Sequence, residues 1–360
     1  MYKEKRNILL TALLFLQIGL VKLSSYYPTF IEAYYSRGIY PKLSLGLRKI
    51  FGWLEVSVGD MLYALLIFLL LRILYRFVRK GKKPRRAILF ELGAAISIFY
   101  FAFYLLWGLN YSRNSLAENL GLSSEKYDIA KVEAITTRLI NKTRKLHQNL
   151  ALHDTLPVVI PYSKTEIIRM TSIGYEELSK ELPEFSYRNE SIKKSLFSLP
   201  LTYMGFAGYL NPLTGEAQVD KLIPAISFPL TCSHEVSHQL GIAYENEANF
   251  VGFLAAAAHK DPYFNYSSMV FALRYALSDL YRYDKELFQK YLDQVPPGVI
   301  KNWKESDLFW QSYENPFEPF FKLFYDGYLK YNQQEHGIET YNQIMGLLIS
   351  FEQAYPYNYY

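Results

Sequence analysis

The residues of this chain best suited to chemistry are two histidines and a glutamate in residues 233–241, with the sequence SHEVSHQLG. His234 and His238 are four residues apart, which places them on one face of an α-helix, where both imidazoles can bind one metal ion. Glu235 lies beside them and can take a proton from a water molecule whose pKa the metal lowers. The pattern predicts a zinc-dependent hydrolytic site. The alternative is a buried helix with two hydrogen-bonded histidines.

The third metal ligand is expected from one of two glutamates that follow this stretch. Glu245 and Glu247 are two residues apart, so on one helix they project about 200° from each other and cannot both reach the metal. Glu245 shares a face with Ala248 and Asn249, and Asn249 could orient a ligating histidine by a hydrogen bond. We therefore favour Glu245, with Glu247 as the alternative.

The motif resembles that of the gluzincin zinc peptidases, in which Glu-x-x-Ala-Asp or Glu-x-x-Ala-Asn follows HExxH on the next helix. It is similar to the membrane peptidases of the HtpX and CAAX-protease type and to the ImmA/IrrE type. The resemblance implies that His234, His238 and Glu245 bind Zn²⁺. It also implies that Glu235 is the general base and that Asn249 supports a ligand. Only six residues separate His238 from Glu245, a short link for these families, which keeps Glu247 open as the ligand.

A substrate-binding strand and an oxyanion donor are also expected. Glycines and turn residues punctuate the apolar residues 201–226, which predicts two strands around a turn. In zinc peptidases a strand of this kind runs beside the metal helix, and its free edge binds an extended substrate. A donor should also stabilise the tetrahedral oxyanion. The candidates are Tyr209, Tyr325, Tyr328 and His336.

A second resemblance covers most of the chain. Residues 35–41 (YSRGIYP), 57–60 (SVGD), 211–217 (NPLTGEA) and 328–330 (YLK), with the metal motif, are similar to an uncharacterised family of bacterial membrane proteins, a domain of unknown function. This likeness implies a bacterial envelope protein and names no substrate.

Charge is distributed unevenly along the chain. Residues 1–111 hold 16 Lys+Arg and 5 Asp+Glu, whereas the rest hold 23 and 29. The larger part is mildly acidic, which argues against nucleic acid as a partner. Cys232 is the only cysteine, so an intrachain disulfide is excluded.

Three apolar stretches predict transmembrane helices at about 7–23, 56–77 and 87–111. Residues 24–55 are expected to be irregular and interfacial. Seven basic residues and no acidic one lie within 76–86, which predicts a cytoplasmic loop. Glu91 is expected to pair with this loop. The amino terminus is then cytoplasmic, and residues 112–360 form an extracytoplasmic, periplasmic domain on a protein of the bacterial inner membrane.

The remaining pattern predicts a mainly α (α+β) fold, with a helical metallopeptidase domain and a small β-sheet. Helices are expected at 123–150, 163–182, 245–259, 267–292, 316–331 and 337–354, and a strand at 157–161. Ser163 and Glu166 form a capping-box pattern. Gly241 is placed to end the metal-binding helix, since it tolerates a positive φ.

These observations predict a membrane-anchored zinc metallopeptidase that acts on a peptide or protein substrate, with the lipid bilayer as a partner. One alternative is a non-catalytic envelope protein that keeps the fold as a binding or structural module. The intact Glu235 argues against that alternative, because a module that only held metal would not need the carboxylate. A transporter is a further alternative, but three spans with Glu91 alone make a poor pathway.

Overall fold

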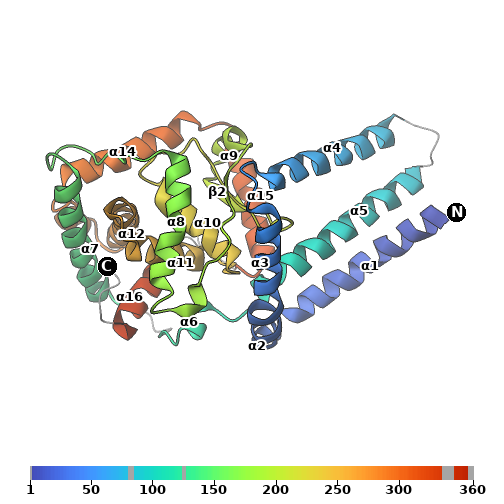
Figure 1. Cartoon of the computed structure of the whole chain (residues 1–360), viewed down its shortest axis with the longest axis horizontal. Coiled ribbons are helices and arrows are strands. Elements are labelled where there is room, and N and C mark those ends of the chain that lie inside the picture. The colour runs from blue at the N-terminus through green and yellow to red at the C-terminus, as the bar shows by residue number, and fades with distance from the viewer. Residues whose placement is uncertain (1, 80–84, 124–126, 335–343, 356–360) are drawn as a thin grey trace. The chain divides into compact units, whose positions relative to one another are not determined.

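A computed structural model describes residues 2–79, 85–123, 127–334 and 344–355 (Figure 1). The described chain is mainly helical with a small three-stranded sheet, as predicted. It divides into two compact units. Unit 1 comprises Met1–Asn114 and Asn211–Glu216, and unit 2 comprises Ser115–Leu210 and Ala217–Tyr360.

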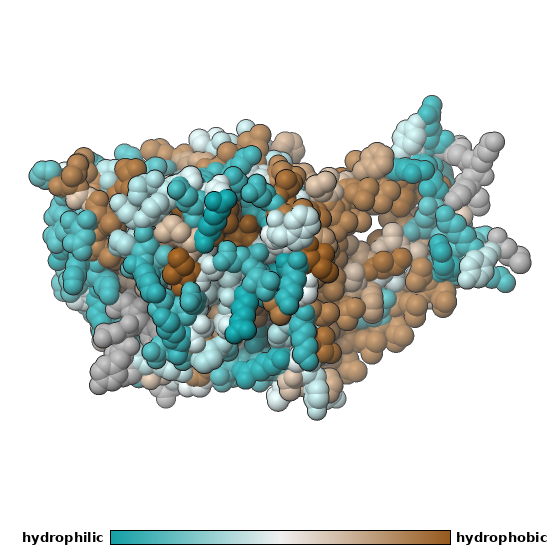
Figure 2. All heavy atoms as spheres, viewed as in Figure 1, coloured by the Kyte–Doolittle hydropathy of each residue, from teal (hydrophilic) through white to brown (hydrophobic). Residues whose placement is uncertain are grey.

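Unit 1 contains three helices that are long and apolar enough to cross a membrane: α1 (Tyr2–Ser24), α4 (Val58–Val78) and α5 (Arg85–Leu106). Figure 2 shows them brown, and therefore hydrophobic, over most of their length. They coincide with the three predicted spans. The third ends earlier than expected, because the chain changes to the 3₁₀ helix η2 (Gly108–Ser112) after α5.

Polar contacts join the helices of unit 1. Thr11 on α1 donates to the carbonyl of Phe90 on α5 at 3.3 Å. Arg76 makes two hydrogen bonds to the Glu91 carboxylate, at 3.1 and 3.0 Å. The prediction that Glu91 pairs with the basic segment is therefore confirmed.

The prediction that residues 24–55 are irregular is wrong. They contain α2 (Pro28–Phe30), the π-helix η1 (Ile31–Ile39) and α3 (Tyr40–Phe51). Tyr40, Ser44 and Arg48 repeat every four residues on α3 and are buried together. Two of these three are polar, so they do not form the apolar stripe by which an amphipathic helix is recognised.

Unit 2 holds the remaining elements. Its helices, with the short 3₁₀ helix η3, and its strands are α6 (Leu116–Asn119), α7 (Ile129–Leu150), α8 (Lys164–Leu178), η3 (Pro183–Phe185), β1 (Ile192–Lys194), α9 (Ser198–Met204), β2 (Gly208–Leu210), β3 (Ala217–Val219), α10 (Phe228–Gln239), α11 (Glu245–Ala258), α12 (Pro262–Tyr283), α13 (Lys285–Leu292), α14 (Pro297–Ser312), α15 (Glu318–Tyr331) and α16 (Ile344–Ala354). The core lies between α7, α8, α10, α11 and α12, which pack against one another (Figure 1). Their inward side chains are buried.

The local signal for the start of α8 is confirmed, whereas α7 starts later than predicted. Ser163 and Glu166 form the expected capping box at the start of α8. α7 begins at Ile129 rather than near residue 123, because Asp128 caps it by accepting from the amide of Lys131 at 2.9 Å. Part of the predicted start, residues 124–126, lies outside the described residues.

The strand predicted at 157–161 is wrong. Val158 and Ile160 are buried, which explains the apolar pattern. The Asn302 side chain, rather than a neighbouring strand, bonds this backbone: its Oδ1 accepts from Val158 N at 3.1 Å and its Nδ2 donates to Val158 O at 3.0 Å. A side-chain amide thus satisfies the buried peptide group.

The predicted helix at 267–292 is two helices, α12 and α13, because the Asp284 carboxylate caps a new start by accepting from the amides of Glu286 and Leu287. α14 was not predicted. The helix expected at 316–331 is α15, and that at 337–354 is described from Ile344, with residues 337–343 outside the described part.

The sheet has the strand order β1-β3-β2, with β1 parallel and β2 antiparallel to β3. The two strands expected within 201–226 are β2 and β3. Asp220 N donates to Ala207 O at 2.8 Å, so residues 207 and 220 form a hydrogen-bonded pair of the antiparallel ladder. Such pairs alternate with non-hydrogen-bonded pairs, to which Gly208 and Leu210 therefore belong. Gly208 and Leu210 therefore direct their N–H and C=O groups away from β3, toward the edge of the sheet.

Candidate metal centre

The three predicted ligands lie on two consecutive helices joined by a tight turn. His234 and His238 are on α10, and Glu245 is the first residue of α11. Gly241 has a φ of 85°, and its amide donates to the carbonyl of His238 at 3.0 Å. The glycine at the end of α10 thus allows the chain to reverse within a few residues, so the short link brings Glu245 back over the histidines.

The donor atoms of these three residues converge. His234 Nε2 lies 3.1 Å from His238 Nε2, and Glu245 Oε2 lies 3.2 Å from the former and 3.5 Å from the latter. Ligands at the usual zinc distances in a tetrahedral site are about 3.3 Å apart. The spacing therefore fits a zinc ion with a fourth, open position. His234, His238 and Glu245 form a group that could bind a metal ion.

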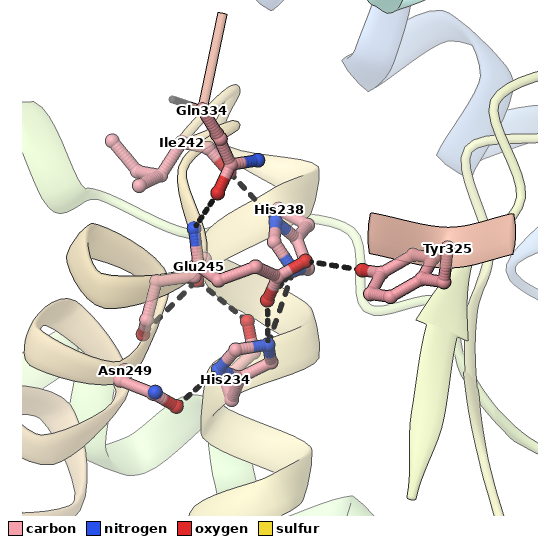
Figure 3. A network of polar contacts seen from close by, with 9 residues as sticks. His234, His238, Ile242, Glu245, Asn249, Tyr325 and Gln334 are labelled. Atoms are coloured by element: carbon pink, nitrogen blue, oxygen red, sulfur yellow. Dashed lines mark hydrogen bonds and ion pairs between the residues drawn. The ribbon is translucent and has the colours of Figure 1, made fainter. Parts of the chain in front are cut away.

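Both imidazoles are held with Nε2 toward the centre of this group. His234 Nδ1 lies 2.9 Å from Asn249 Oδ1, and His238 Nδ1 lies 2.7 Å from the carbonyl of Ile242 (Figure 3). Both partners are acceptors, so they favour the tautomer that carries its proton on Nδ1 and leaves the Nε2 lone pair for a metal.

The Glu245 carboxylate is held from the opposite side by Tyr325 of α15. The Tyr325 hydroxyl donates to Oε1 at 2.7 Å, which leaves Oε2 directed at the histidines (Figure 3). Gln334 Oε1 accepts from the Glu245 amide at 3.3 Å. The Tyr325 contact orients the carboxylate, and the Gln334 contact holds the backbone from which it projects.

Glu235 is buried between the metal helix and the sheet. Its Oε2 has no hydrogen-bond partner among the described residues. Burial raises the pKa of its carboxyl to about 7, although the charges of the two histidines lower it. A buried carboxyl without a protein partner, with a pKa near neutrality, is typical of a general base.

Strand β2 approaches Glu235 closely because residue 208 is glycine. A Cβ at this position would lie 2.6 Å from Glu235 Oε1 and 2.7 Å from the carbonyl of Gln218. A second glycine, Gly252, allows α11 to pack closely against α10, since a Cβ at this position would lie 2.8 Å from His234 N. Neither glycine was identified from the sequence as a point of close approach.

The charges of the ligands shift one another. Burial alone would lower the pKa of His238, but the Glu245 carboxylate outweighs it and raises the pKa to about 9. Burial likewise opposes ionisation of Glu245, whose pKa the two histidines hold well below its ordinary value. The metal-free site therefore keeps a proton that a metal ion must displace.

Glu247, the alternative third ligand, lies elsewhere. Its Oε1 accepts from the backbone amide of Leu116 at 2.6 Å, at the start of α6. Its buried carboxylate therefore satisfies a helix terminus. The structure brings together His234, His238, Glu245 and Asn249, and does not bring Glu247 to them.

Of the four candidate oxyanion donors, Tyr325 contacts the candidate ligand Glu245. Tyr328 stacks on Tyr325 with ring centroids 5.9 Å apart, and Tyr209 lies in the middle of β2. His336 lies outside the described residues. Sequence spacing could not show that Tyr325 contacts Glu245, because the two are 80 positions apart.

Unit 2 carries the His/His/Glu group, and unit 1 carries the three apolar helices. Together these features are those of a candidate membrane metalloprotein. A family model described as "Protein of unknown function (DUF3810)" matches residues 35–349. The chain therefore belongs to this DUF3810 family. No curated protein and no solved structure matches the chain.

Proposed function

We propose that this protein is a membrane-anchored zinc-dependent peptidase. The observation that carries the proposal is the convergence of His234 Nε2, His238 Nε2 and Glu245 Oε2 within 3.1 to 3.5 Å. Zinc would supply a Lewis acid that activates water and polarises the substrate carbonyl. The buried Glu235 beside this group supplies the carboxylate that a purely structural metal site would not need.

Glu235 is the residue that moves protons in this proposal. With a pKa near 7, its carboxylate can accept a proton from the attacking water and then give it to the leaving amine. His234 and His238 are held by Asn249 and by the Ile242 carbonyl, so they keep their orientation during the reaction.

The edge of β2 supports a peptide as the substrate. Gly208 and Leu210 direct backbone donors and acceptors toward this edge, and Gly208 lies against Glu235. An extended chain can add to such an edge as a further strand. This arrangement would place a peptide bond beside the general base, with recognition resting largely on the backbone.

We also propose that unit 1 anchors the protein in the inner membrane, with the amino terminus in the cytoplasm and unit 2 in the periplasm. The support is the run of seven basic residues between Arg76 and Arg86. We place the boundary between the membrane domain and the extracytoplasmic domain at residues 111–112. In the peptidase proposal, Glu245 is the third metal ligand.

The test combines metal content with hydrolysis by the purified full-length chain. The wild type should bind one zinc ion and cleave components of a peptide library, detected by mass spectrometry. Glu235→Gln should keep zinc and lose cleavage by a factor of about 10² or more, because the amide has no basic oxygen. His234→Ala and His238→Ala should lose zinc. Glu181→Gln, on an exposed residue, is the matched control.

Two outcomes would contradict the peptidase. The first is cleavage by Glu235→Gln at the wild-type rate. The second is a wild type that binds zinc and cleaves nothing in the library, a result that would favour the non-catalytic module instead.

A further inference from the structure

Helix α15 of unit 2 exposes an apolar face. Phe317, Phe320, Leu323 and Phe324 are 67 to 73 % exposed. Their spacing of three and four residues places them along one side of the helix. Leu329, on the other side, is fully buried. A surface helix of a soluble protein normally shows the reverse pattern, and large contiguous apolar patches mark binding surfaces.

The opposite face of the same helix reaches the candidate metal centre. Tyr325 donates to Glu245, and its ring packs edge-on against Phe206, which precedes β2, with centroids 4.9 Å apart. Two lysines of this helix form ion pairs within it: Lys322 with Glu318 at 2.6 Å, and Lys330 with Asp326 at 2.8 Å. One helix thus connects an exposed apolar surface to a metal ligand.

The chain itself indicates what covers this surface. Unit 1 carries three helices able to cross a bilayer, and α5 ends at Leu106. Unit 2 begins nine residues later at Ser115, a distance of at most about 30 Å for a fully extended chain. Unit 2 is therefore tethered within reach of lipid. Aromatic and leucine side chains on one face, with lysines beside it, are typical of a helix that lies in a membrane surface.

We propose that α15 lies in the surface of the bilayer that holds unit 1, with Phe317, Phe320, Leu323 and Phe324 among the acyl chains. Because Tyr325 contacts Glu245 from the other face, this position brings the candidate metal centre close to the membrane surface. Under the peptidase function proposed above, on which this last step rests, the substrates are polypeptide segments adjacent to the membrane.

The experiment measures the depth of α15 in lipid and does not depend on hydrolysis. Cys232 is the only cysteine and is buried, so single cysteines introduced at exposed positions can be labelled selectively with a nitroxide. The full-length Phe320→Cys and Phe324→Cys variants are reconstituted in vesicles of phosphatidylethanolamine and phosphatidylglycerol. Electron paramagnetic resonance then compares collisions with oxygen, which concentrates in lipid, and with chromium oxalate, which stays in water.

The proposal expects more collisions with oxygen than with chromium oxalate at both positions. Lys322→Cys, on another face of the same helix, and Leu152→Cys, 92 % exposed in unit 2, are the controls and should show the reverse. Chromium oxalate dominance at 320 and 324 would place the face in water and overturn the proposal. Low collision rates with both reagents would show that protein covers the face, such as a second copy of the chain, and would also overturn it.

Discussion

The hydroxyl of Tyr325 donates a 2.7 Å hydrogen bond to Oε1 of Glu245, a carboxylate whose other oxygen lies 3.2 Å from His234. This contact joins α15 to the first turn of α11. A tyrosine on a helix far along the chain therefore sets the orientation of the candidate third ligand.

Removal of this hydroxyl should weaken metal binding without abolishing it. Tyr325→Phe keeps the ring packing on Phe206 and loses the donor to Glu245. Partners of ligands typically contribute 10- to 100-fold to metal affinity, so we expect the zinc Kd to rise by about that factor. Competition with a chromophoric chelator measures it. Tyr331→Phe, at an exposed position on the same helix, should leave the Kd unchanged, and an equal change in both variants would contradict this role.

The third ligand can be assigned by a matched pair of substitutions. Glu245→Gln should reduce zinc affinity by orders of magnitude, because the anionic donor beside His234 and His238 is lost. Glu247→Gln should leave zinc affinity near that of the wild type and lower the free energy of unfolding by about 1–3 kcal/mol, because the charged acceptor of Leu116 N is lost. A zinc titration and a thermal melt of each variant decide between them. The reverse ranking in zinc affinity would give the ligand role to Glu247.

Zinc affinity should rise with pH across the neutral range. The pKa of His238 is raised to about 9 in the metal-free site, so a proton occupies it at neutral pH and zinc must displace it. Below that pKa, the affinity should increase by up to about tenfold for each pH unit, and the increase should end above it. Titrations at pH 6, 7 and 8 with a competing chelator test this, and calorimetry in buffers of different ionisation enthalpy counts the released proton. An affinity independent of pH in this range would contradict the prediction.

A methyl group on β2 should disturb the general base and spare the metal. Gly208→Ala places a Cβ 2.6 Å from Glu235 Oε1, so either the carboxylate or the strand must move. We expect cleavage of a proven substrate to fall at least tenfold, about 1.4 kcal/mol in the barrier, with zinc content unchanged. Gly327→Ala is the control, since a Cβ there would meet nothing within 4 Å beyond the neighbouring backbone of its own helix. Wild-type cleavage by Gly208→Ala would argue against a catalytic position for Glu235.

Reporter fusions test the orientation in the membrane. A fusion after Arg86 should behave as cytoplasmic and one after Tyr360 as extracytoplasmic, because the basic residues at 76–86 are expected to stay inside. Alkaline phosphatase and a fluorescent protein, each active on one side only, give opposite readouts. A cytoplasmic carboxyl-terminal fusion would overturn the three-span topology and place unit 2 in the cytosol.

Sequence alone determined the features that depend on neighbours along the chain. The four-residue spacing of His234 and His238 is one helical turn, so it follows from α-helix geometry wherever the helix forms. The capping box of Ser163 and Glu166 is equally local. The three long apolar helices follow from length and composition.

Other local patterns gave wrong predictions of secondary structure, because the contacts that decide the structure come from residues or positions that the pattern does not include. Val158 and Ile160 alternate like a strand, yet the Asn302 side chain, 144 positions away, takes the backbone bonds that a neighbouring strand would have made. In residues 24–55 the buried helical positions include Ser44 and Arg48, which no hydrophobic pattern would select.

Only the tertiary structure decided which groups complete the candidate site. It placed Glu245, rather than Glu247, beside the histidines, brought Tyr325 to Glu245, and set Gly208 against Glu235. These relationships join residues on different elements, so they depend on how helices and strands pack. Spacing along a chain fixes positions within one helix, whereas contacts between helices and strands arise from the packing of side chains that no local period encodes.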